Sequence, residues 1–425
     1  MRVYCETFGC TMNRGDTELM LGCLKEAGHE PTSNLSEADI IVVNTCAVKG
    51  PTQRRVLRRL RELRELDGKP IVVAGCLPLI DLGSIERLGT FAGLVSCHSL
   101  GSISTVVEKI AKGETNVREL TYQALEKPCL PKLRSSNISA IVAIAEGCTS
   151  NCSYCSVRMA RGKLRSFDEK AILLEIKKAL DNGGREILLT AQDTAAYGID
   201  SGKTLPELLN KIVDIDGKFM VRVGMMNPKT TKHILPKLLD VYESEKIYKF
   251  VHLPVQSGDD DVLQAMRRGY TVDDFLKIVD GFRKKFDDLY LATDIIVGFP
   301  TEGEKEFMNS CELIEKIGPD KVNLTRFSPM LGTDAAKMKQ VDEREVKRRS
   351  RLLNEICHSI GYEINRNYIG RTAGCLVVEK GKRGNYTARL KNYKPAIVEN
   401  AAIGEFAKIN ITEAKSIYLI GNIVR

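Results

Sequence analysis

Short apolar runs rich in β-branched residues alternate with amphipathic stretches through the first third of the chain. The runs RVYCETF, ADIIVVNTC and PIVVAGC predict strands, and helical periodicity over 16–27 and 52–66 predicts helices between them. Strands that alternate with helices are typical of a parallel, Rossmann-like α/β sheet, which binds ligands beyond the carboxyl ends of its strands. We therefore expect the cysteines at these strand ends to meet at one edge of the sheet: Cys10, Cys46 and Cys76.

A second alternating series follows residues 116–136, a stretch without periodicity that contains Pro128 and Pro131 and is typical of a linker. Six runs predict strands, and helical patterns such as 168–180 and 271–286 separate them. These runs are ISAIVAIA, REILLTA, FMVRVGM, YKFVHLPV, LYLATDIIV and KVNLTRF. Six βα units are too few for a closed eight-stranded barrel, so we expect a partial (β/α)6 barrel with an open side.

The pattern changes again near the carboxyl end. A long charged helix is predicted over 342–366, and the short runs TAGCLVVEKGKRGNYTARL, PAIVEN, EFAKINITEA and SIYLIGNIV follow it. Such runs predict a small β-barrel of about five strands, an architecture often used to bind nucleic acid. The expected units are an N-terminal α/β domain, a linker, a partial barrel and a C-terminal β-barrel, over 1–115, 116–136, 137–360 and 361–425.

Composition narrows the class of protein. Of the 425 residues, 43% are hydrophobic and 28% are charged, which is an ordinary globular balance. The first residues lack the layout of a signal peptide, and no apolar run approaches the ~18–20 residues that cross a bilayer. We expect a soluble, cytoplasmic protein without a membrane partner. Its 13 cysteines are then buried thiols or metal ligands rather than disulfides.

Positive charge is concentrated at the carboxyl end. Residues 366–425 hold eleven Lys and Arg against four Asp and Glu, so this segment carries +7 of the net +8. Tyr386 and Tyr393 lie among these cations and can stack on bases. The alternative is a merely solvated barrel surface. The candidate RNA contacts are Lys380, Lys382, Arg383, Arg389, Lys391 and Lys394.

An arginine-rich helix is predicted over 54–66. Val56, Leu60 and Leu63 form an apolar stripe, and arginines occupy the other faces. Glutamates at i,i+4 spacing neutralise part of this charge, which favours an ordinary solvated face. The alternative is a surface that contacts phosphates beside Cys46.

The stretch EGCTSNCSYCSV has the densest cysteine pattern. Cys148, Cys152 and Cys155 follow the first strand of the central series at C-x3-C-x2-C spacing, without a fourth Cys or His close by. Three thiolates can hold a cubane iron–sulfur cluster by three irons and leave the fourth iron open. A structural zinc site would need a fourth ligand at typical spacing. Thiols placed by chance are the alternative to a metal site.

This spacing, with Tyr154 before the last cysteine, resembles the signature of the radical S-adenosylmethionine (SAM) enzymes. In that family the open iron binds the amino and carboxylate groups of SAM, and an electron from the cluster cleaves SAM to a 5′-deoxyadenosyl radical. The resemblance implies SAM contacts at Tyr154 and at strand-end polar residues of the barrel: Gln192, Asp193, Gln256, Ser257 and Asp294. The alternative is that Tyr154 packs beside the loop and that each polar group caps a following helix.

Further motifs extend the resemblance over nearly the whole chain and narrow it to the methylthiotransferases. TFGCTMNRGDTELM, VVNTCAVKGPTQRR and VVAGCLP resemble the N-terminal motifs of that subfamily. TAQDTAAYG, HLPVQSGDDDVLQAMRRGY and TDIIVGFPTEGE match further motifs, and the C-terminal module resembles the TRAM domain, an RNA-binding β-barrel. The resemblance implies that Cys10, Cys46 and Cys76 hold a second 4Fe-4S cluster, whose open iron carries a sulfur that one SAM methylates. The other cysteines, Cys97 among them, are expected to be small core or surface thiols.

GCLPLI, EGCTSNCSYCSVRMARGKLRS and LTAQDTAAYG most resemble the archaeal and eukaryotic branch of the methylthiotransferases. The resemblance implies transfer of the methylthio group to carbon 2 of N6-threonylcarbamoyladenosine, next to the anticodon, after a second SAM is cleaved. The implied partners are the anticodon stem-loop of tRNA, SAM and a reductant protein.

One turn departs from the family pattern. The Pro-Gly-Thr-Pro turn after the last barrel strand is PMLGTDAAKM here, with Leu331 and Asp334 in place of prolines.

Two other hypotheses of function remain open: a methylthiotransferase that acts on an aspartate of a ribosomal protein, and a non-catalytic RNA-binding protein with structural clusters. The positive C-terminal module disfavours the first.

Overall fold

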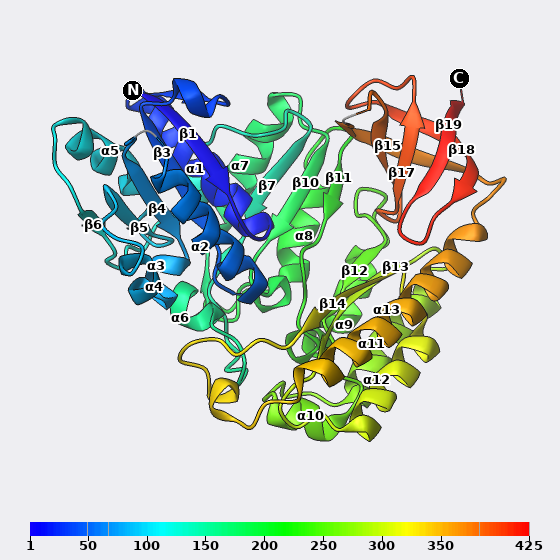
Figure 1. Ribbon diagram of the computed structural model, residues 1–425. Helices are drawn as coiled ribbons and strands as arrows, with labels where there is room; N and C mark the ends of the chain where they lie inside the picture. The colour runs from blue at the N-terminus through cyan, green and yellow to red at the C-terminus, as the bar shows by residue number, and fades with distance from the viewer. Residues whose placement is uncertain (49, 67, 382, 425) are drawn as a thin grey trace.

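The computed structural model describes residues 1–48, 50–66, 68–381 and 383–424. Three units follow one another along the chain (Figure 1): an α/β unit in blue, a central barrel in green to yellow, and a small β-barrel in red. This architecture confirms the mixed α/β class, the partial barrel and the C-terminal β-barrel expected from the sequence. Within the described residues, no helix has both the length and the apolar character needed to span a membrane.

The N-terminal unit is built on a six-stranded parallel sheet in the order β2-β1-β3-β4-β5-β6. Its strands are β1 (Arg2–Thr7), β2 (Glu30–Thr32), β3 (Ile40–Thr45), β4 (Ile71–Gly75), β5 (Gly93–Ser96) and β6 (Val117–Glu119). Its helices are α1 (Thr11–Glu26), α2 (Gly50–Arg64), α3 (Leu77–Ile80), α4 (Leu82–Glu86) and α5 (Ile103–Ala111). The predicted strands are the three longest, whereas β2, β5 and β6 span three or four residues.

Two boundaries differ from the expectation. β6 lies inside 116–136, because it pairs with β5 and completes the sheet. The rest of this stretch packs between the first two units and buries Lys127. α1 begins at Thr11 rather than near residue 16, so Cys10 stands at the helix N-cap.

Helices cover both faces of the N-terminal sheet. β3 is buried at all six positions, as expected for a central strand of a parallel sheet. Leu19 of α1 and Val106 of α5 belong to the core on one face. The predicted apolar stripe of α2 is confirmed, since Val56, Leu60 and Leu63 are buried against the other face.

The central unit contains all six predicted strands, as two three-stranded parallel sheets in the orders β11-β10-β7 and β12-β13-β14. A parallel bridge between Val221 and Ile247 joins the two sheets, so the six strands form one partial barrel. The strands are β7 (Ser139–Ala143), β10 (Glu186–Thr190), β11 (Met220–Arg222), β12 (Phe250–His252), β13 (Tyr290–Val297) and β14 (Lys321–Arg326), and a short antiparallel pair, β8 (Ala145–Glu146) with β9 (Arg165–Ser166), follows β7. The helices are α6 (Val157–Arg161), α7 (Glu169–Asp181), α8 (Leu205–Val213), α9 (Pro228–Val241), α10 (Asp260–Ala265), α11 (Val272–Lys285) and α12 (Glu304–Ile317).

The barrel strands present two different faces. Alternate residues such as Val221, Val251 and Leu291 pack outward into the large core with the helices. The residues between them point inward, because successive side chains of a strand face opposite sides. Phe250 and Tyr290 are inward residues near the start of their strands, and they contact the C-terminal unit.

Helix α13 (Glu343–Arg366) leads into the C-terminal β-barrel, which is closed in the order β15-β16-β17-β19-β18. Its strands are β15 (Thr372–Lys380), β16 (Tyr386–Leu390), β17 (Pro395–Glu399), β18 (Phe406–Ala414) and β19 (Leu419–Val424). Leu376 and Tyr393 pack against Met220, Tyr248 and Phe250 of the partial barrel. The C-terminal barrel therefore covers the amino ends of the central strands, opposite the ends where ligands are expected.

Candidate iron–sulfur centres

The first candidate site is the loop that joins β8 to α6 at the carboxyl end of the partial barrel. Cys148, Cys152 and Cys155, called the barrel trio below, are free and partly buried thiols on this loop. Gly147 precedes them with a φ of +81°, and a Cβ there would lie 2.1 Å from the carbonyl oxygen of Lys163. Glycine is therefore required where the chain enters the loop.

Hydrogen bonds hold the loop against its neighbours. The Ser153 amide donates to the carbonyl oxygen of Met266 (3.1 Å), and the Ala335 amide donates to the carbonyl oxygen of Ser153 (2.9 Å). The Gln192 side-chain oxygen accepts from the Gly147 amide (2.7 Å). The loop is thus fixed by the chain after α10, by the turn after β14 and by the end of β10.

Burial and one arginine set the charge state of the barrel trio. Burial raises the pKa of Cys148, and burial together with Cys152 raises the pKa of Cys155 to about 12. The free thiols of Cys148 and Cys155 keep their protons for this reason, and metal binding replaces those protons. Arg268, a buried residue, places Nη1 3.2 Å from Cys152 Sγ and offsets part of the thiolate charge.

Arg268 is a site residue that the sequence analysis did not single out. Its Nε donates to the Tyr270 hydroxyl (2.9 Å), and its Nη2 donates to the Pro254 carbonyl oxygen (3.2 Å). These bonds fix the guanidinium beside Cys152. A signal was present, since Arg268 lies in the motif HLPVQSGDDDVLQAMRRGY, but nothing in the spacing distinguishes it from Arg267.

Two of the expected SAM contacts are buried and make local hydrogen bonds. Asp193 is buried and accepts from the Asn227 amide (3.0 Å), from Thr230 Oγ1 (2.8 Å) and from the Ala195 amide (3.1 Å). Burial raises its pKa to about 6. Ser257 is also buried, and its Oγ accepts from the amide of the residue that caps α10. The capping alternative describes Asp193, which is the N-cap of the short 3-10 helix at 194–196, whereas Ser257 binds the residue that caps α10. A contact of either residue with SAM stays a prediction.

The other expected contacts surround the barrel trio or line the inner face. Tyr154 packs edge-on against Phe299 at 6.3 Å between ring centroids. Gln256 has a φ of +74° and joins its backbone to β13. Asp294 Oδ1 lies 2.8 Å from His252 Nε2 and accepts from Asn323 Nδ2 at 2.8 Å. His252, Asp294 and Asn323 come from β12, β13 and β14. The inner face of the barrel is therefore polar on its open side.

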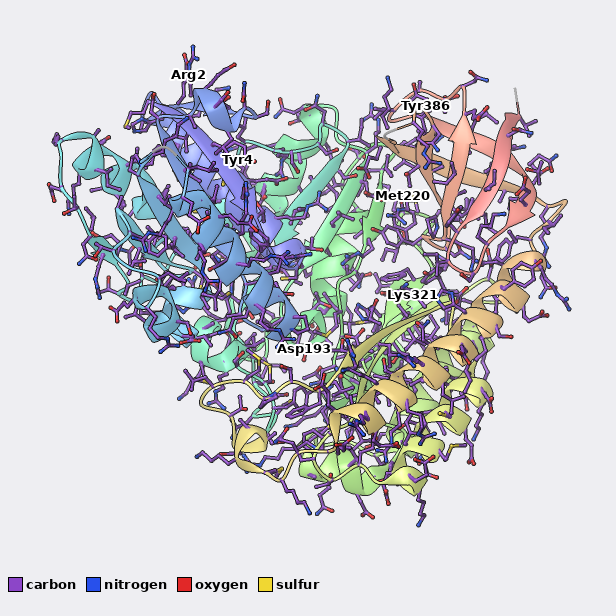
Figure 2. The ribbon with its side chains drawn as sticks, viewed as in Figure 1. Arg2, Tyr4, Asp193, Met220, Lys321 and Tyr386 are labelled. Carbon is purple, nitrogen blue, oxygen red and sulfur yellow. The ribbon has the colours of Figure 1, made fainter. Side chains whose placement is uncertain are left out.

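In Figure 2, Asp193 and Met220 mark opposite ends of the barrel, and Met220 is the one beside the C-terminal unit. The turn after β14, where the chain departs from the family pattern, belongs to the Asp193 end, because it contacts the cluster loop. In that turn Leu331 is exposed, and Asp334 pairs with Arg267 at 2.7 Å.

The second candidate site lies at the carboxyl edge of the N-terminal sheet. Cys10, Cys46 and Cys76, called the N-terminal trio below, follow β1, β3 and β4, as expected. Gly9 has a φ of +116°, and a Cβ there would lie 2.6 Å from Cys46 Cβ. The Cys76 amide donates to the Thr45 carbonyl oxygen (3.0 Å). The three strand ends therefore converge, with Cys46 and Cys76 buried and Cys10 exposed.

Asn13 joins these strand ends to the central unit. Its Nδ2 donates to the carbonyl oxygens of Phe8 and Thr45, both at 2.9 Å, and its Oδ1 accepts from Arg161 Nη2 at 2.9 Å. Asn44 Nδ2 donates to the Asn13 carbonyl oxygen at 2.8 Å. Because these bonds are buried, the loops that carry the N-terminal trio have one defined arrangement.

A fourth thiol and an arginine lie beside the N-terminal trio. A hydrogen bond with Cys97 and the charge of Arg161 lower the pKa of Cys76, although burial opposes them. Burial, with Cys76 nearby, raises the pKa of Cys46 to about 12. Cys97 is buried and donates to the Ala160 carbonyl oxygen at 3.1 Å, in agreement with its expected place as a small core thiol.

A buried network of four charged residues connects the two candidate sites. Arg161 of α6 pairs with Asp16 of α1 (2.7 Å) and with Glu146 of β8 (2.6 Å). Lys127 pairs with the same two carboxylates at 2.7 and 2.8 Å. Burial alone would raise the pKa of Glu146, but Lys127 and Arg161 outweigh it and hold the pKa at about 2. Two cations and two carboxylates thus balance where α1, β8, α6 and residues 127–129 meet.

Neither trio brings its three sulfur atoms within 4.8 Å of one another. Among the described residues, three ligand atoms within 4.8 Å of one another occur only at Cys97, His98 and Glu146. Tetrahedral zinc, with bonds of about 2.3 Å, needs ligands that close, whereas a four-iron cluster carries each thiolate on a different iron. In the group of Cys97, His98 and Glu146, the Glu146 carboxylate already forms ion pairs with Lys127 and Arg161.

The predicted RNA-binding residues fall into two groups. Lys380, Arg383 and Lys391 are exposed on the C-terminal barrel. Arg389 is partly buried, with its guanidinium carbon 4.5 Å from the Tyr393 ring centroid. Lys394 is buried and pairs with an aspartate of the central unit, so it does not face a ligand. The prediction for Lys382 lies outside the described residues.

Helix α2 carries both paired and unpaired arginines. Arg58 pairs with Glu62 at 3.6 Å, and Arg59 pairs with Glu6 at 2.7 Å, as on an ordinary solvated face. Arg54 and Arg55 make no ion pair within the described part of the chain, and the guanidinium carbon of Arg55 stands 5.5 Å from the Phe8 ring centroid. Two cations near the N-terminal trio are therefore left without carboxylates.

Family models match each of the three units. The Radical SAM superfamily model matches residues 142–314, the model of uncharacterized protein family UPF0004 matches residues 2–94, and the TRAM domain model matches residues 366–424. Membership of the Radical SAM superfamily implies SAM and a 4Fe-4S cluster, and the TRAM domain together with the family implies a tRNA substrate.

Solved structures resemble the fold. The radical S-adenosylmethionine methyltransferase TsrM of Kitasatospora setae, with cobalamin and a 4Fe-4S cluster bound, has a TM-score of 0.58 at 13% identity. The likeness covers 79% of this chain and 74% of that one. The cobalamin-dependent radical enzyme OxsB has a TM-score of 0.55 at 12% identity and covers 84% of this chain and 55% of its own. At these identities the likeness shows the fold alone.

Two curated relatives match over the full length of this chain. A protein of Pyrococcus horikoshii named "Probable threonylcarbamoyladenosine tRNA methylthiotransferase" is 45% identical, and the match covers 100% of both chains. The human "Threonylcarbamoyladenosine tRNA methylthiotransferase" is 33% identical over 99% of this chain and 73% of its own. The chain thus belongs to the threonylcarbamoyladenosine tRNA methylthiotransferase family of radical SAM enzymes.

Proposed function

We propose that this chain adds a methylthio group to carbon 2 of N6-threonylcarbamoyladenosine, next to the anticodon of tRNA. The observation that carries the proposal is the presence of two separate three-thiol sites, connected by a buried network of ion pairs. A single site would serve SAM cleavage alone. Two sites serve cleavage and sulfur transfer, which is the activity that the names of the relatives describe.

The barrel trio is our candidate for the cluster that binds SAM, and the N-terminal trio is our candidate for an auxiliary cluster. When bound, a 4Fe-4S cluster with an open iron supplies an electron and a coordination position for SAM or for sulfur. Arg268 offsets thiolate charge at the first site, and Arg161 does so at the second. The two arginines thus have equivalent roles in the two sites.

The inner face of the barrel is our candidate for the place where the adenosine is held. His252, Asp294 and Asn323 form a hydrogen-bonded row there and can orient a polar base edge. The amino side of this space is closed by the C-terminal barrel, whose aromatic residues pack on the strands. Closure excludes water from a reaction that removes hydrogen from an unactivated carbon.

We propose that the anticodon stem-loop binds the exposed cations Lys380, Arg383 and Lys391 together with Arg54 and Arg55 of α2. The proposed division of labour assigns residues 1–115 to the auxiliary site, 116–136 to the connection, 137–360 to the radical SAM site and 361–425 to RNA. A separate reductant protein delivers electrons to the barrel trio, and the reaction takes place in the cytoplasm, where tRNA is used.

Nucleoside mass spectrometry of tRNA tests the proposal. The full chain is reconstituted anaerobically with iron and sulfide and incubated with SAM, a strong reductant and tRNA that contains N6-threonylcarbamoyladenosine. We expect the 2-methylthio derivative of that nucleoside. Formation of 5′-deoxyadenosine without any change in the tRNA would contradict the proposed substrate. The absence of both products from a protein with a full iron content would favour the non-catalytic alternative.

A further inference from the structure

An arginine on the inner face of the partial barrel lacks a carboxylate partner. Arg222 ends β11 two positions after Met220, so the two side chains share the inner face, while Val221 between them packs outward. Arg222 Nε is buried without a hydrogen-bond partner. No ion pair within the described part of the chain includes Arg222.

Aromatic rings hold this arginine in place. The guanidinium carbon of Arg222 lies 5.8 Å from the ring centroid of Phe250 and 5.8 Å from that of Tyr393, which comes from the C-terminal barrel. Tyr393 is itself fixed, because its ring packs 4.9 Å from Phe250 and 5.0 Å from Tyr248. A planar cation packed beside two fixed rings has few alternative positions, so it is preorganised for a ligand.

A second arginine stacks on the same tyrosine. The guanidinium carbon of Arg389 lies 4.5 Å from the Tyr393 ring centroid, and Arg389 also makes no ion pair within the described residues. The Tyr393 ring therefore contacts Arg222 from the central unit and Arg389 from the C-terminal unit. The pair connects the exposed cations of the C-terminal barrel with the inner face of the partial barrel.

The buried arginines of the central unit, Arg161, Arg268 and Arg349, all have ion-pair or hydrogen-bond partners, whereas the buried Nε of Arg222 has none. Arg161 is neutralised by Asp16 and Glu146, and Arg349 by Glu302 and Glu345. Removing a cation from water without a partner is unfavourable, because its hydration is lost and nothing replaces it. Two unpaired guanidinium groups around one ring therefore point to an anion that arrives with the substrate.

The place of Arg222 along the barrel suits a group attached to the reacting base. Asn227 is five residues further along the chain, and its Nδ2 donates to Ser150 of the cluster loop at 3.2 Å. Five residues span at most about 16–18 Å, so Arg222 lies within that distance of Asn227, whose side chain contacts the cluster loop. The row of His252, Asp294 and Asn323 occupies the inner face of the neighbouring sheet, on β12, β13 and β14.

We propose that Arg222 and Arg389, which both contact the Tyr393 ring, form an oxyanion-binding site for the RNA substrate, and that the anion is the carboxylate of the threonylcarbamoyl group. The proposal rests on the proposed function, since that substrate carries a carboxylate. A guanidinium binds a carboxylate or a phosphate through two parallel hydrogen bonds, so a backbone phosphate of the same RNA shares this chemistry.

The test measures binding rather than catalysis. The anaerobically reconstituted full chain is titrated with three fluorescent anticodon stem-loops, which contain adenosine, N6-threonylcarbamoyladenosine or its carboxamide, in which the carboxylate is neutral. We expect the wild-type chain to prefer the carboxylate form. Arg222→Gln should weaken binding of that form by about tenfold to a hundredfold, the usual range for a lost charged hydrogen bond. It should leave the other two stem-loops unchanged.

Matched variants complete the test. Arg351→Gln removes the same charge from an exposed position on α13 and should leave all three affinities unchanged. Arg222→Lys keeps the charge but loses the planar fork, so it should restore binding only in part. Iron content and melting temperature verify folding. If Arg222→Gln does not fold, Arg389→Gln, at a partly exposed position, replaces it.

The outcomes separate the possible anions. Equal weakening of all three stem-loops would assign the site to a backbone phosphate and overturn the carboxylate assignment. Unchanged binding of all three in both Arg222→Gln and Arg389→Gln would overturn the oxyanion site itself. A wild-type chain that prefers the carboxylate form but makes no methylthiolated product would contradict the proposed function and not this site.

Discussion

The barrel trio and the N-terminal trio hold the same three side chains in different ways. The barrel trio lies on one loop, within eight consecutive residues, and its arrangement depends on Gly147 and a few local hydrogen bonds. The N-terminal trio comes from three separate strands, and only the folded sheet brings Cys10, Cys46 and Cys76 together. The first site is thus a local structure, and the second is a tertiary one.

Their surroundings differ as well. Every thiol of the barrel trio is partly buried, whereas the N-terminal trio has two buried thiols and one exposed thiol, Cys10. Cys97 and Arg161 flank the N-terminal trio, and Arg161 belongs to the central unit. The N-terminal site therefore depends on the other unit for its electrostatics, and the barrel trio has Arg268 from its own unit.

The largest effect is expected from the barrel trio. Cys148→Ala, Cys152→Ala or Cys155→Ala should abolish SAM cleavage, because the cluster that supplies the electron loses a ligand. The measurement is 5′-deoxyadenosine formation under strong reductant. Cys129→Ala, at an exposed position outside both trios, is the control and should cleave SAM at the wild-type rate. Cleavage retained in a barrel-trio variant would refute the assignment of that trio.

The N-terminal trio should affect only one of the two products. Cys46→Ala or Cys76→Ala should lose methylthiolation of tRNA while 5′-deoxyadenosine is still formed, because the barrel trio is intact. Both products are quantified from the same reaction by mass spectrometry. Loss of both products, in a protein that still folds, would mean that the two sites do not work separately.

The buried network between the sites should contribute to stability. Arg161→Met leaves the carboxylates of Asp16 and Glu146 with Lys127 alone, and breaking a buried pair costs about 3–5 kcal/mol of unfolding free energy. Arg348→Met removes an exposed ion pair on α13 and should cost about 0–1 kcal/mol. Denaturant unfolding of the two apoproteins compares them. Equal losses would show that the network is not a stabilising connection.

The smallest effects are expected on the C-terminal barrel. Lys380→Gln, Arg383→Gln and Lys391→Gln should each weaken tRNA binding modestly and lower the slope of log K against log salt by roughly 0.7–0.9. Lys394→Gln should leave that slope unchanged and lower the melting temperature instead, because Lys394 is buried against Asp320. Titrations at several salt concentrations distinguish the two cases. If Lys394→Gln changed the slope as much as the variants of the exposed cations do, the Lys394 ammonium would contact the RNA.

The sequence predicted the strands that contain long apolar runs, and it predicted the cysteine trios that follow those strands. The six central strands and the five C-terminal strands are confirmed. The strands β2, β5 and β6 were not predicted, because three or four residues are too few to show a hydrophobic period. Pairing with neighbouring strands of the sheet stabilises them. The convergence of the N-terminal trio was predictable, since parallel strands end at one edge.

Other features required the folded chain. The partners Lys127 and Asp16 are 111 positions apart, and no local pattern links them. Asp193, expected at SAM, also caps a short helix, and Ser257 binds the residue that caps α10; a polar residue at a strand end fits a capping or a ligand-binding role equally well. Lys394 stands in a basic segment but is buried, because the C-terminal barrel packs on the central unit through that turn. Composition alone does not distinguish the two faces of such a barrel.

Iron and sulfide counting on the anaerobically reconstituted full chain tests the two-site account most directly. The account predicts about eight irons per chain, and about four after either trio is replaced by alanine. About four irons in the wild-type chain, with no further loss when the N-terminal trio is replaced, would contradict it.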